Sequence, residues 1–436
     1  MTQRTIKIGL AGLGTVGGGV LKLLAQQGDL IEQRCGARLK VAAVTARDRA
    51  KVRPLPLDGI KWHDSAEALA RDPALEVVVE LIGGADGPAR HLCEAALKAG
   101  KPVVTANKAL LAHHGTALAH LAETNKTSLR FEAAVAGGIP IIKALREGLA
   151  GNRISAIHGI LNGTCNYILT AMQEGVRAGK PREFASVLAE AQRLGYAEAD
   201  PSMDIDGHDA AHKLAILTSV AFGCPVDLAA VHVEGIRQIS AMDIEYALTL
   251  GYRIKLLCIS RSSADGVLQR VHPCMVPESS PLAHVDGVYN AVITQGDFVG
   301  PSVFEGRGAG EGPTASAVVA DLIDLARGLS VPTFGVPANR LVAQATIPMA
   351  RHAGPYYIRL MVVDRPGVIA DVAACLRDEQ VSVESMLQRS RNPDEAVPVV
   401  LITHEASEAS VARALSTIER LGTVLEPPHM IRIEHL

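Results

Sequence analysis

The sequence predicts an α/β protein made of several domains, and three observations support this. Strand-like and helix-like segments alternate over the first third of the chain, which is typical of a parallel sheet flanked by helices. Three β-rich runs at 254–260, 267–275 and 288–294 then suit an antiparallel sheet. Residues 356–436 follow the order βαββαβ, which predicts a small ferredoxin-like unit. A chain of 436 residues exceeds one ordinary core, so two or three domains are expected.

Composition and charge narrow the class of protein. Hydrophobic content of 48% and charged content of 20% describe a soluble globular protein, and no apolar run reaches the length of a membrane span. A net charge of −3 gives no basic surface for nucleic acid or an anionic membrane. The seven cysteines are dispersed without a C-x-x-C pair, and no signal peptide precedes the first strand. We therefore expect reduced thiols and a cytoplasmic location.

The first motif is a glycine-rich turn. A β-rich run at 5–11 leads into Gly-Leu-Gly-Thr-Val-Gly at 12–17, and a helix pattern follows at 20–24. Strand, G-x-G-x-x-G and helix in this order predict a Rossmann-type dinucleotide-binding turn, in which the helix N-terminus faces a pyrophosphate. The alternative is a glycine-rich turn that binds nothing. The residues expected to face the cofactor are Gly12, Gly14, Thr15, Val16 and Gly17.

The end of the second predicted strand, 39–45, bears on the choice of cofactor. An NAD-selective fold usually places Asp or Glu there to bind the adenosine ribose. This chain instead has Arg47, Asp48 and Arg49 in a base-rich segment. Arg47 suits a 2′-phosphate, so NADP is favoured, while Asp48 keeps NAD open.

Two further strand ends contribute candidate residues. Buried-strand patterns at 77–82 and 101–105 end near Gly83 and Thr105, and Lys108 opens the next helix. Because ligands bind at the carboxyl ends of parallel strands, we expect these three residues near the nicotinamide end of the cofactor. Lys108 can also be explained as an ordinary lysine in the first turn of a helix.

The segment 195–214 is unusually acidic and runs into the apolar stretch 215–222. A helix that begins near residue 206 would project Asp209 and Lys213, four apart, from one face. A surface ion pair is the alternative, and such pairs stabilise little. However, a helix apolar on nearly every side is buried, and buried charges need partners or a ligand. The segment therefore predicts a site for a small polar substrate, with Lys213 as a candidate proton carrier.

Three other features carry weaker predictions. The loop 131–140 contains one carboxylate among glycines, which suits either a hard cation or, more readily, a hinge between domains. A second glycine cluster at 305–314 precedes a helix expected to return to the dinucleotide domain, with the Gly310 backbone near the cofactor. Cys165 has no obvious base beside it, so a packed thiol is favoured over a nucleophile.

The tail has its own linker at 349–355, which suggests an added regulatory module. Asp364 and Gly367 lie at its first strand-to-helix turn. Backbone N–H groups at that helix start suit the carboxylate of an amino-acid effector, and Asp364 suits its ammonium group.

Together, these motifs resemble the homoserine dehydrogenase family over essentially the whole chain. The resemblance rests on the glycine turn, Thr-Ala-Asn-Lys at 105–108, Asn-Gly-Thr-Cys-Asn-Tyr at 162–167 and Gly-Ala-Gly-Glu-Gly-Pro-Thr-Ala at 308–315. Its most specific part is Gly-Tyr-Ala-Glu-Ala-Asp-Pro at 195–201 continuing to Lys213. The tail, with Asp-Arg-Pro-Gly-Val, resembles an ACT domain, an amino-acid-sensing module.

The resemblance implies reduction of L-aspartate 4-semialdehyde to L-homoserine with NADPH or NADH, on the route to threonine, methionine and isoleucine. It implies that Lys213 donates the proton and that Lys108 serves both cofactor and substrate. Glu198 and Asp209 would bind the substrate, supported by Asp204. It further implies a homodimer or homotetramer, and feedback inhibition by threonine at the ACT domain. A monovalent cation such as Na⁺ or K⁺ would be held by Glu132, Val135, Gly137 and Ile139.

Elementary chemistry agrees with this assignment, because a lysine near an aldehyde stabilises the alkoxide that hydride transfer creates. One rival is a phosphorylating semialdehyde dehydrogenase, which needs a cysteine nucleophile and a base. The other is a non-catalytic nucleotide and amino-acid sensor, which would not require both Lys108 and Lys213. The domain limits expected are 1–134 for nucleotide binding, 135–310 for substrate binding and dimerisation, 311–348 for the returning helix, and 356–436 for the ACT domain.

Overall fold

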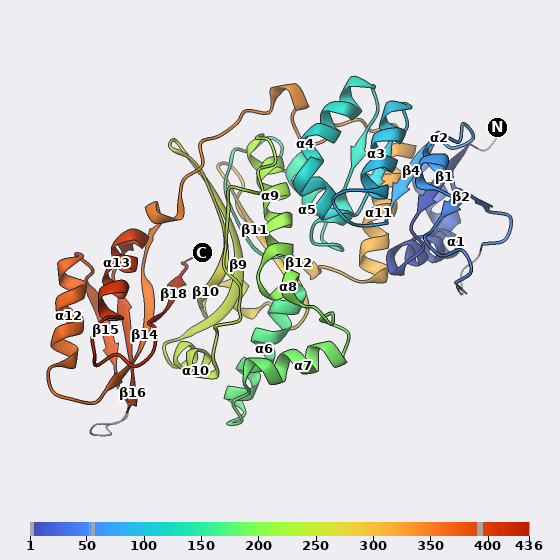
Figure 1. The fold of residues 1–436 in the computed structure, drawn as a ribbon. Coiled ribbons are helices and arrows are strands. Elements are labelled where there is room, and N and C mark those ends of the chain that lie inside the picture. The colour runs from blue at the N-terminus through green and yellow to red at the C-terminus, as the bar shows by residue number, and fades with distance from the viewer. Residues whose placement is uncertain (1–3, 52, 54–56, 390–395, 436) are drawn as a thin grey trace.

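A computed structural model describes residues 4–51, 53, 57–389 and 396–435. Three units follow one another across the molecule (Figure 1): an N-terminal sheet with its helices, a central sheet, and a smaller C-terminal unit at the opposite end. Among the described residues, no helix has the length and apolarity needed to cross a membrane.

The N-terminal unit is a parallel sheet of six strands in the order β3-β2-β1-β4-β5-β6. This is the doubly wound arrangement expected of a Rossmann-type domain, so the predicted fold class is confirmed. Its strands are β1 (Thr5–Ala11), β2 (Arg38–Thr45), β3 (Lys61–Trp62), β4 (Val77–Glu80), β5 (Val103–Thr105) and β6 (Leu129–Arg130). Its helices are α1 (Thr15–Cys35), α2 (Ala66–Arg71), α3 (Pro88–Lys98) and α4 (Lys108–Thr124).

The turn between β1 and α1 needs its glycines for steric reasons. Gly12 has φ of +102°, and a Cβ there would lie 2.3 Å from the carbonyl oxygen of Leu81. A Cβ on Gly17 would lie 2.1 Å from the carbonyl oxygen of Gly12. Any other residue at either position would push α1 away from the sheet.

The central unit contains an antiparallel sheet in the order β12-β11-β7-β9-β10. Helix α9 is buried along most of its length and packs against α4, β9 and β10, so it lies between this sheet and the N-terminal unit. The strands are β7 (Ile154–Ile160), β8 (Val231–Val233), β9 (Tyr252–Ser263), β10 (Gly266–Pro277), β11 (Tyr289–Gly296) and β12 (Gly300–Arg307). The helical segments from the start of this unit are η1 (Glu132–Ala134), α5 (Ile141–Lys143), η2 (Ala144–Gly148), α6 (Gly163–Arg177), α7 (Phe184–Arg193), α8 (Ser202–Ile205), α9 (His208–Phe222), α10 (Ala241–Thr249) and η3 (Pro281–His284).

Helix α11 (Glu311–Ala326) leaves the central sheet and packs against α1. A Cβ on Gly19 of α1 would lie 2.7 Å from the carbonyl oxygen of Glu311, which shows how closely the two helices approach. Ala315, Val318 and Leu322 of α11 are buried in the same apolar core as strands β1, β2 and β4.

The C-terminal unit has the strand order β18-β14-β16-β15 with α12 and α13, which confirms the predicted ferredoxin-like fold. Strand β18 also pairs in parallel with β10, with Cys274 opposite Arg432 and Met275 opposite Ile433. The two sheets are therefore continuous, whereas the sequence suggested only a module behind a linker. The elements are η5 (Met349–Arg351), β13 (Ala353–Gly354), β14 (Tyr356–Val363), α12 (Val368–Asp378), β15 (Val383–Leu387), β16 (Ala396–Thr403), β17 (Ala406–Ser407), α13 (Glu408–Ile418) and β18 (His429–Ile433). The short helix η4 (Ala338–Arg340), which precedes them, packs instead against α4 of the N-terminal unit.

Candidate active site

Two lysines flank one buried carboxylate at the start of α9. Oδ1 of Asp209 lies 2.8 Å from Nζ of Lys108, and Oδ2 lies 2.8 Å from Nζ of Lys213. Lys213 also donates a hydrogen bond of 2.7 Å to the carbonyl oxygen of Leu161 at the end of β7. Helices α4 and α9 thus bring together two lysines that are far apart in sequence. The predicted pairing of Asp209 with Lys213 is present, and it is buried rather than on the surface.

Two residues that the sequence left without a role hold the acidic loop. Nδ2 of Asn162 donates to Oδ1 of Asp204 at 2.7 Å and to Oδ2 of Asp209 at 2.9 Å. The hydroxyl of Thr164 lies 3.2 Å from Oδ2 of Asp204. Asn162 also caps α6, because its Oδ1 accepts a 2.8 Å hydrogen bond from the N–H of Cys165. Their position directly after a buried strand is the sequence signal that could have identified them.

The charges in this site fix its protonation. Burial opposes ionisation of Asp209, but Lys213 and Lys108 hold the pKa of that carboxyl well below its ordinary value. Burial likewise works against the charge of Lys108, yet Asp209, followed by Asp204 and Glu198, raises the pKa of this lysine. Glu198 is exposed and still contributes to the field at Lys108. Lys108 therefore carries a proton at neutral pH, next to an ionised Asp209.

Cys165 lies beside this array but does not have the character of a nucleophile. Its side chain is fully buried, and its Sγ lies 3.2 Å from the carbonyl oxygen of Asp204. Burial, together with the charges of Asp204 and Asp209, raises the pKa of the Cys165 thiol well above its ordinary value. A thiol that keeps its proton is a poor nucleophile, which weighs against a phosphorylating semialdehyde dehydrogenase.

A cleft of about 930 Å³ opens beside the glycine turn of the N-terminal unit. Four residues expected to bind the cofactor line it, namely Gly12, Gly14, Arg47 and Gly83. Lys51 and Arg53 line it too, and Arg53 donates hydrogen bonds to the backbone carbonyls of Asp48 at 2.6 Å and Lys51 at 2.8 Å. Nothing in the sequence marked Arg53, because it belongs to none of the recognised motifs. A helix N-terminus, a turn whose glycines allow close approach, and basic side chains together suit a dinucleotide phosphate.

Glu80, buried at the end of β4, shapes the neighbouring loop. Its Oε1 accepts hydrogen bonds from the N–H groups of Ile82 at 2.7 Å and Gly83 at 3.0 Å. The hydroxyl of Thr105 donates to Oε2 of Glu80 at 2.5 Å. Thr105 is fully buried, so the structure places it underneath the Gly83 loop.

The residues of the expected cation loop lie together between η1 and α5. The carboxylate of Glu132 accepts hydrogen bonds from the N–H groups of Ile142 at 3.0 Å and Lys143 at 2.8 Å. Burial and the nearby Asp321 raise the pKa of Glu132 to about 7. Oδ1 of Asp321 is buried without a hydrogen-bond partner among the described residues. Val135 and Ile139 are buried, and a Cβ on Gly137 would lie 2.5 Å from the carbonyl oxygen of Gly308.

The remaining candidates stand at the starts of three helices. Thr15 and Val16 form the first turn of α1, and Gly310 precedes α11 with φ of +123°. Gly367 precedes α12 with φ of +94°, and Oδ1 of Asp364 accepts a 3.4 Å hydrogen bond from Gln388. Asp364 and Gly367 belong to the C-terminal unit and are not part of the lysine–carboxylate site.

A Rossmann-type cleft together with a lysine–carboxylate site defines an NAD(P)-dependent oxidoreductase that acts on a small polar substrate. The model of the homoserine dehydrogenase NAD binding domain matches residues 12–132, that of homoserine dehydrogenase matches 140–323, and that of the ACT domain matches 356–423. The chain belongs to the homoserine dehydrogenase family. It catalyses the NAD(P)-dependent interconversion of L-aspartate 4-semialdehyde and L-homoserine in amino-acid biosynthesis, and its C-terminal unit is an ACT domain.

Proteins named homoserine dehydrogenase match this chain over most or all of its length. The chain is 45% identical over 440 residues to homoserine dehydrogenase of Neisseria gonorrhoeae and 43% identical over 448 residues to that of Pseudomonas aeruginosa, with 100% of each chain covered. The crystal structure of a homoserine dehydrogenase from Thiobacillus denitrificans matches with a TM-score of 0.93 at 44% identity, over 99% of both chains. A hyperthermophilic archaeal homoserine dehydrogenase in complex with NADPH matches with a TM-score of 0.63 at 28% identity, over 75% of this chain and 99% of that one.

Proposed function

We propose that Lys213 is the proton donor of this dehydrogenase. An ammonium group has three N–H bonds, and Asp209 and Leu161 accept two of those of Lys213. The third N–H is then available to an aldehyde oxygen, whose developing negative charge it stabilises before the proton is transferred. The nicotinamide supplies the hydride when it is bound. In the reverse direction Lys213 takes the proton from the hydroxyl group of homoserine.

The neighbouring charges would bind and orient the substrate. Glu198 is exposed near Lys108 and is suited to the substrate's ammonium group. Asp209 and, behind it, Asp204 complete the acidic side of the site, held by Asn162. Lys108 has 43% of its side chain exposed, so its ammonium group can reach both cofactor and substrate. The observation that carries this proposal is the arrangement of Lys108, Asp209 and Lys213 within hydrogen-bond distance.

The test is the kinetics of Lys213→Ala. We expect kcat to fall by about 10²-fold or more, the usual scale of acid–base catalysis, with the Kd for NADPH unchanged. Glu198→Gln should instead raise the KM for homoserine, and Lys98→Ala on the exposed face of α3 serves as the control. Wild-type turnover by Lys213→Ala would transfer the role to Lys108.

The cofactor proposed is NADP, with NAD as a weaker alternative. The side chain of Asp48 accepts hydrogen bonds from the N–H groups of Ala50 at 2.9 Å and Lys51 at 3.1 Å, which engages it in its own turn. Arg47 lines the cleft, whereas the guanidinium of Arg49 lies 5.4 Å above the ring of Trp62. Arg47→Asp should therefore shift the ratio of kcat/KM toward NAD, and Arg49→Asp should not. An unchanged ratio in Arg47→Asp would contradict the assignment.

A monovalent cation, Na⁺ or K⁺, is proposed for the loop of Glu132, Val135, Gly137 and Ile139. Two buried carboxylates, Glu132 and Asp321, lie close enough to raise the pKa of Glu132, and a cation would relieve that repulsion. Turnover should be higher in KCl or NaCl than in choline chloride at equal ionic strength. Equal turnover in all three salts would argue against the site.

The ACT domain is proposed to bind threonine at the turn of Asp364 and Gly367 and so to inhibit the enzyme. The start of α12 offers backbone N–H groups to a carboxylate, as at other helix N-termini. Threonine should lower turnover of the full-length chain, and Asp364→Asn should weaken the inhibition. Inhibition that is identical in both proteins would place the effector elsewhere.

Assembly and location complete the proposal. A homodimer or homotetramer is supported by the apolar edge of the central sheet, where Phe298 is 91% exposed and Val303 of β12 is 49% exposed. Light scattering that gives the mass of a monomer would contradict this.

A cytoplasmic location is supported by seven cysteines that are all unpaired. The functional segments proposed are 1–134, 135–310, 311–348 and 356–436, and the packing of α11 on α1 supports the third.

A further inference from the structure

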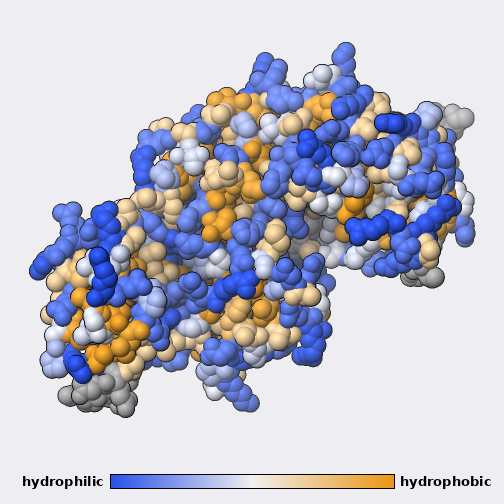
Figure 2. Space-filling model, viewed as in Figure 1, coloured by the Kyte–Doolittle hydropathy of each residue, from blue (hydrophilic) through white to orange (hydrophobic). Residues whose placement is uncertain are grey.

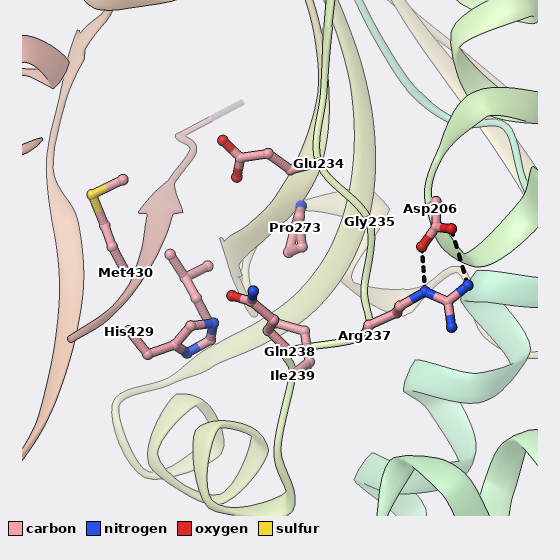
Figure 3. A pocket seen from close by; sticks show the side chains of 10 residues that line it. Asp206, Glu234, Gly235, Arg237, Gln238, Ile239, Pro273, His429 and Met430 are labelled. Carbon is pink, nitrogen blue, oxygen red and sulfur yellow. Dashed lines mark hydrogen bonds and ion pairs between the residues drawn. The ribbon is translucent and has the colours of Figure 1, made fainter. Parts of the chain in front are cut away.

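A cavity of about 400 Å³ lies where the ACT domain meets the central unit (Figure 3). The segment 234–239, between β8 and α10, forms one wall, and β18 forms the other. Figure 3 shows the side chains of Gln238 and His429 close to each other, with Pro273 above them and Glu234 farther up, at the other side of the space. Its size is within the usual range for small-molecule sites.

The polar groups of the cavity are complementary to a zwitterion. Hydrogen bonds from His232 and Arg432 outweigh burial and lower the pKa of Glu234 to about 2, so this carboxylate is ionised. Arg432 bonds both of its oxygens and His232 bonds Oε1, while the side chain is 40% exposed, so Oε2 can accept one further hydrogen bond from an ammonium group. Gln238 lines the cavity with an exposed side chain, so its amide group is open to a ligand. Nδ1 of His429 is held 3.3 Å from Oδ2 of Asp243, which fixes the ring at the cavity wall. Gln238 and His429 are thus placed to donate hydrogen bonds to a carboxylate.

The apolar part of the wall suits a small aliphatic side chain. Pro273, Ile239 and Ile431 contribute it, and Ile239 and Ile431 are buried. The side chain of Met430 lies on the other face of β18, against the core of the ACT domain. Glu234 at one side, amide and imidazole donors at another, and apolar atoms between them match the layout of an α-amino acid.

The wall of the cavity is also directly connected to the acidic loop of the active site. The N–H of Ile236 donates to the carbonyl oxygen of Ile205 at 2.8 Å, and a Cβ on Gly235 would lie 2.2 Å from that same oxygen. The guanidinium of Arg237 points away from the cavity, and its Nε and Nη2 both donate hydrogen bonds to the carboxylate of Asp206. Asp206 lies between Asp204 and Asp209 in sequence, so a shift of the wall moves the loop that carries both.

The opposite end of the wall is fastened to the ACT domain. Arg432 of β18 forms two contacts of 2.7 Å with the carboxylate of Glu234. The same guanidinium also binds Glu408 at the start of α13. The segment 234–239 is therefore fixed at one end by the ACT domain and at the other by the substrate-binding loop.

We propose that this cavity binds a small α-amino acid and that occupation of the cavity changes substrate binding through Arg237 and Asp206. The inference rests on the proposed regulation by an amino acid and adds a site within one chain, separate from the turn of Asp364 and Gly367. The cofactor cleft shares no lining residue with the cavity. The effect therefore falls on the KM for homoserine rather than on that for NADP.

The test is calorimetric titration of the full-length chain with L-threonine, L-methionine and L-isoleucine as probes. Gln238→Leu keeps the approximate size of the side chain and removes the amide group that would bond the probe's carboxylate, so we expect the tightest-binding probe to lose about tenfold or more in affinity. Gln295→Leu, an exposed position on β11 remote from the cavity, is the matched control and should bind as wild type. Basal turnover should be unchanged in both variants.

Arg237→Met tests the connection separately from binding. It should retain the wild-type Kd for the probe while the probe loses its effect on the KM for homoserine. Loss of binding in Asp364→Asn with full binding in Gln238→Leu would overturn the cavity site and leave regulation at the turn intact. If threonine does not bind but another probe does, and Gln238→Leu weakens the binding of that probe, the cavity site is supported and threonine is ruled out as the effector. No binding by any of the three probes would overturn both.

Discussion

The two junctions that hold the central unit are built from different chemistry. On the nucleotide side, α11 packs against α1 through small and aliphatic residues such as Ala315, Val318 and Leu322. On the ACT side, apolar contacts are joined by buried charges, because Arg270, Arg432 and Glu434 are each no more than 4% exposed at the pairing of β10 with β18. Apolar contacts stabilise a junction without requiring particular bond directions. A junction with buried charges is stable only while every charge keeps its partner. The stability of the ACT side therefore depends on its ion pairs, whereas that of the nucleotide side depends on packing.

A second charged group at the ACT junction makes the same point. Asp243 caps α10 through Ser240 and is fully buried. It accepts hydrogen bonds from the hydroxyl of Tyr357 at 3.1 Å and from Nε of Arg359 at 2.8 Å, both on β14. One carboxylate thus holds a central helix and an ACT strand together, so the two units cannot separate without exposing it unpaired.

The largest expected effect comes from removing a charge at the ACT junction. Arg432→Met leaves Glu408 and Glu234 without their common partner, and we expect the free energy of unfolding to fall by about 3 to 5 kcal/mol. Urea denaturation followed by far-UV circular dichroism measures this. Adding Glu408→Gln to the variant should recover part of the loss, because one of the stranded charges disappears. No recovery would show that packing, not charge, dominates there.

A smaller effect is expected from the apolar junction. Val318→Ala removes two methyl groups from a fully buried side chain and should cost about 2 kcal/mol. The single tryptophan, Trp62, belongs to the nucleotide-binding sheet, so its fluorescence reports unfolding on this side. The loss should be the same at pH 5 and pH 8, because no titrating group is removed. A strong pH dependence would contradict the apolar description.

Acid should weaken the ACT junction before it affects the apolar one. Burial, with the nearby Arg270, lowers the pKa of His352 to about 4, whereas the ordinary value is 6.5. Between pH 4 and pH 6.5, His352 is therefore protonated in the unfolded chain but not in the folded chain. The free energy of unfolding consequently falls as the pH drops from 6.5 toward 4. The slope reaches at most about 1.4 kcal/mol per pH unit for one proton. His352→Phe should flatten it, and an unchanged slope would assign the proton to another group such as His158.

The smallest effect is expected from the ion pair at the edge of the apolar junction. Nζ of Lys22 lies 2.6 Å from Oε1 of Glu311, with the two side chains 48% and 41% exposed. Such exposed pairs contribute less than about 1 kcal/mol and are screened by salt. Glu311→Gln should therefore change the urea midpoint little at low salt and not at all at high salt. A loss comparable to that of Arg432→Met would erase the contrast between the two junctions.

The local signals of this chain were sufficient for its fold class. The glycine turn at 12–17 was predictable because Gly12 and Gly17 occupy positions where a side chain cannot fit. The βαββαβ order of the tail could be predicted equally well, because the periodicity of a strand or a helix depends only on nearby residues. Helix α9 was expected to be buried because it is apolar on nearly every side, and the structure bears this out.

Part of the active site could also be predicted from local sequence patterns. Asp209 and Lys213 are four residues apart on one helix, so their pairing followed from helical geometry. The contact of Lys108 with Asp209 spans about a hundred residues and depends on how α4 packs against α9. Asn162 could have been identified from its position directly after a buried strand, whereas no motif or periodicity in the sequence points to Arg53.

The sequence by itself determined the kinds of domain, the glycine turn and the charged residues that could take part in hydride-transfer chemistry. These features depend on neighbours within a few positions along the chain. Only the tertiary structure decided that the ACT strand β18 extends the central sheet through β10. It also decided that Arg432, Glu234 and Arg237 connect the ACT domain to the acidic loop. Strand pairing and buried ion pairs join segments that are distant along the chain, and no local pattern specifies the partner of a buried charge.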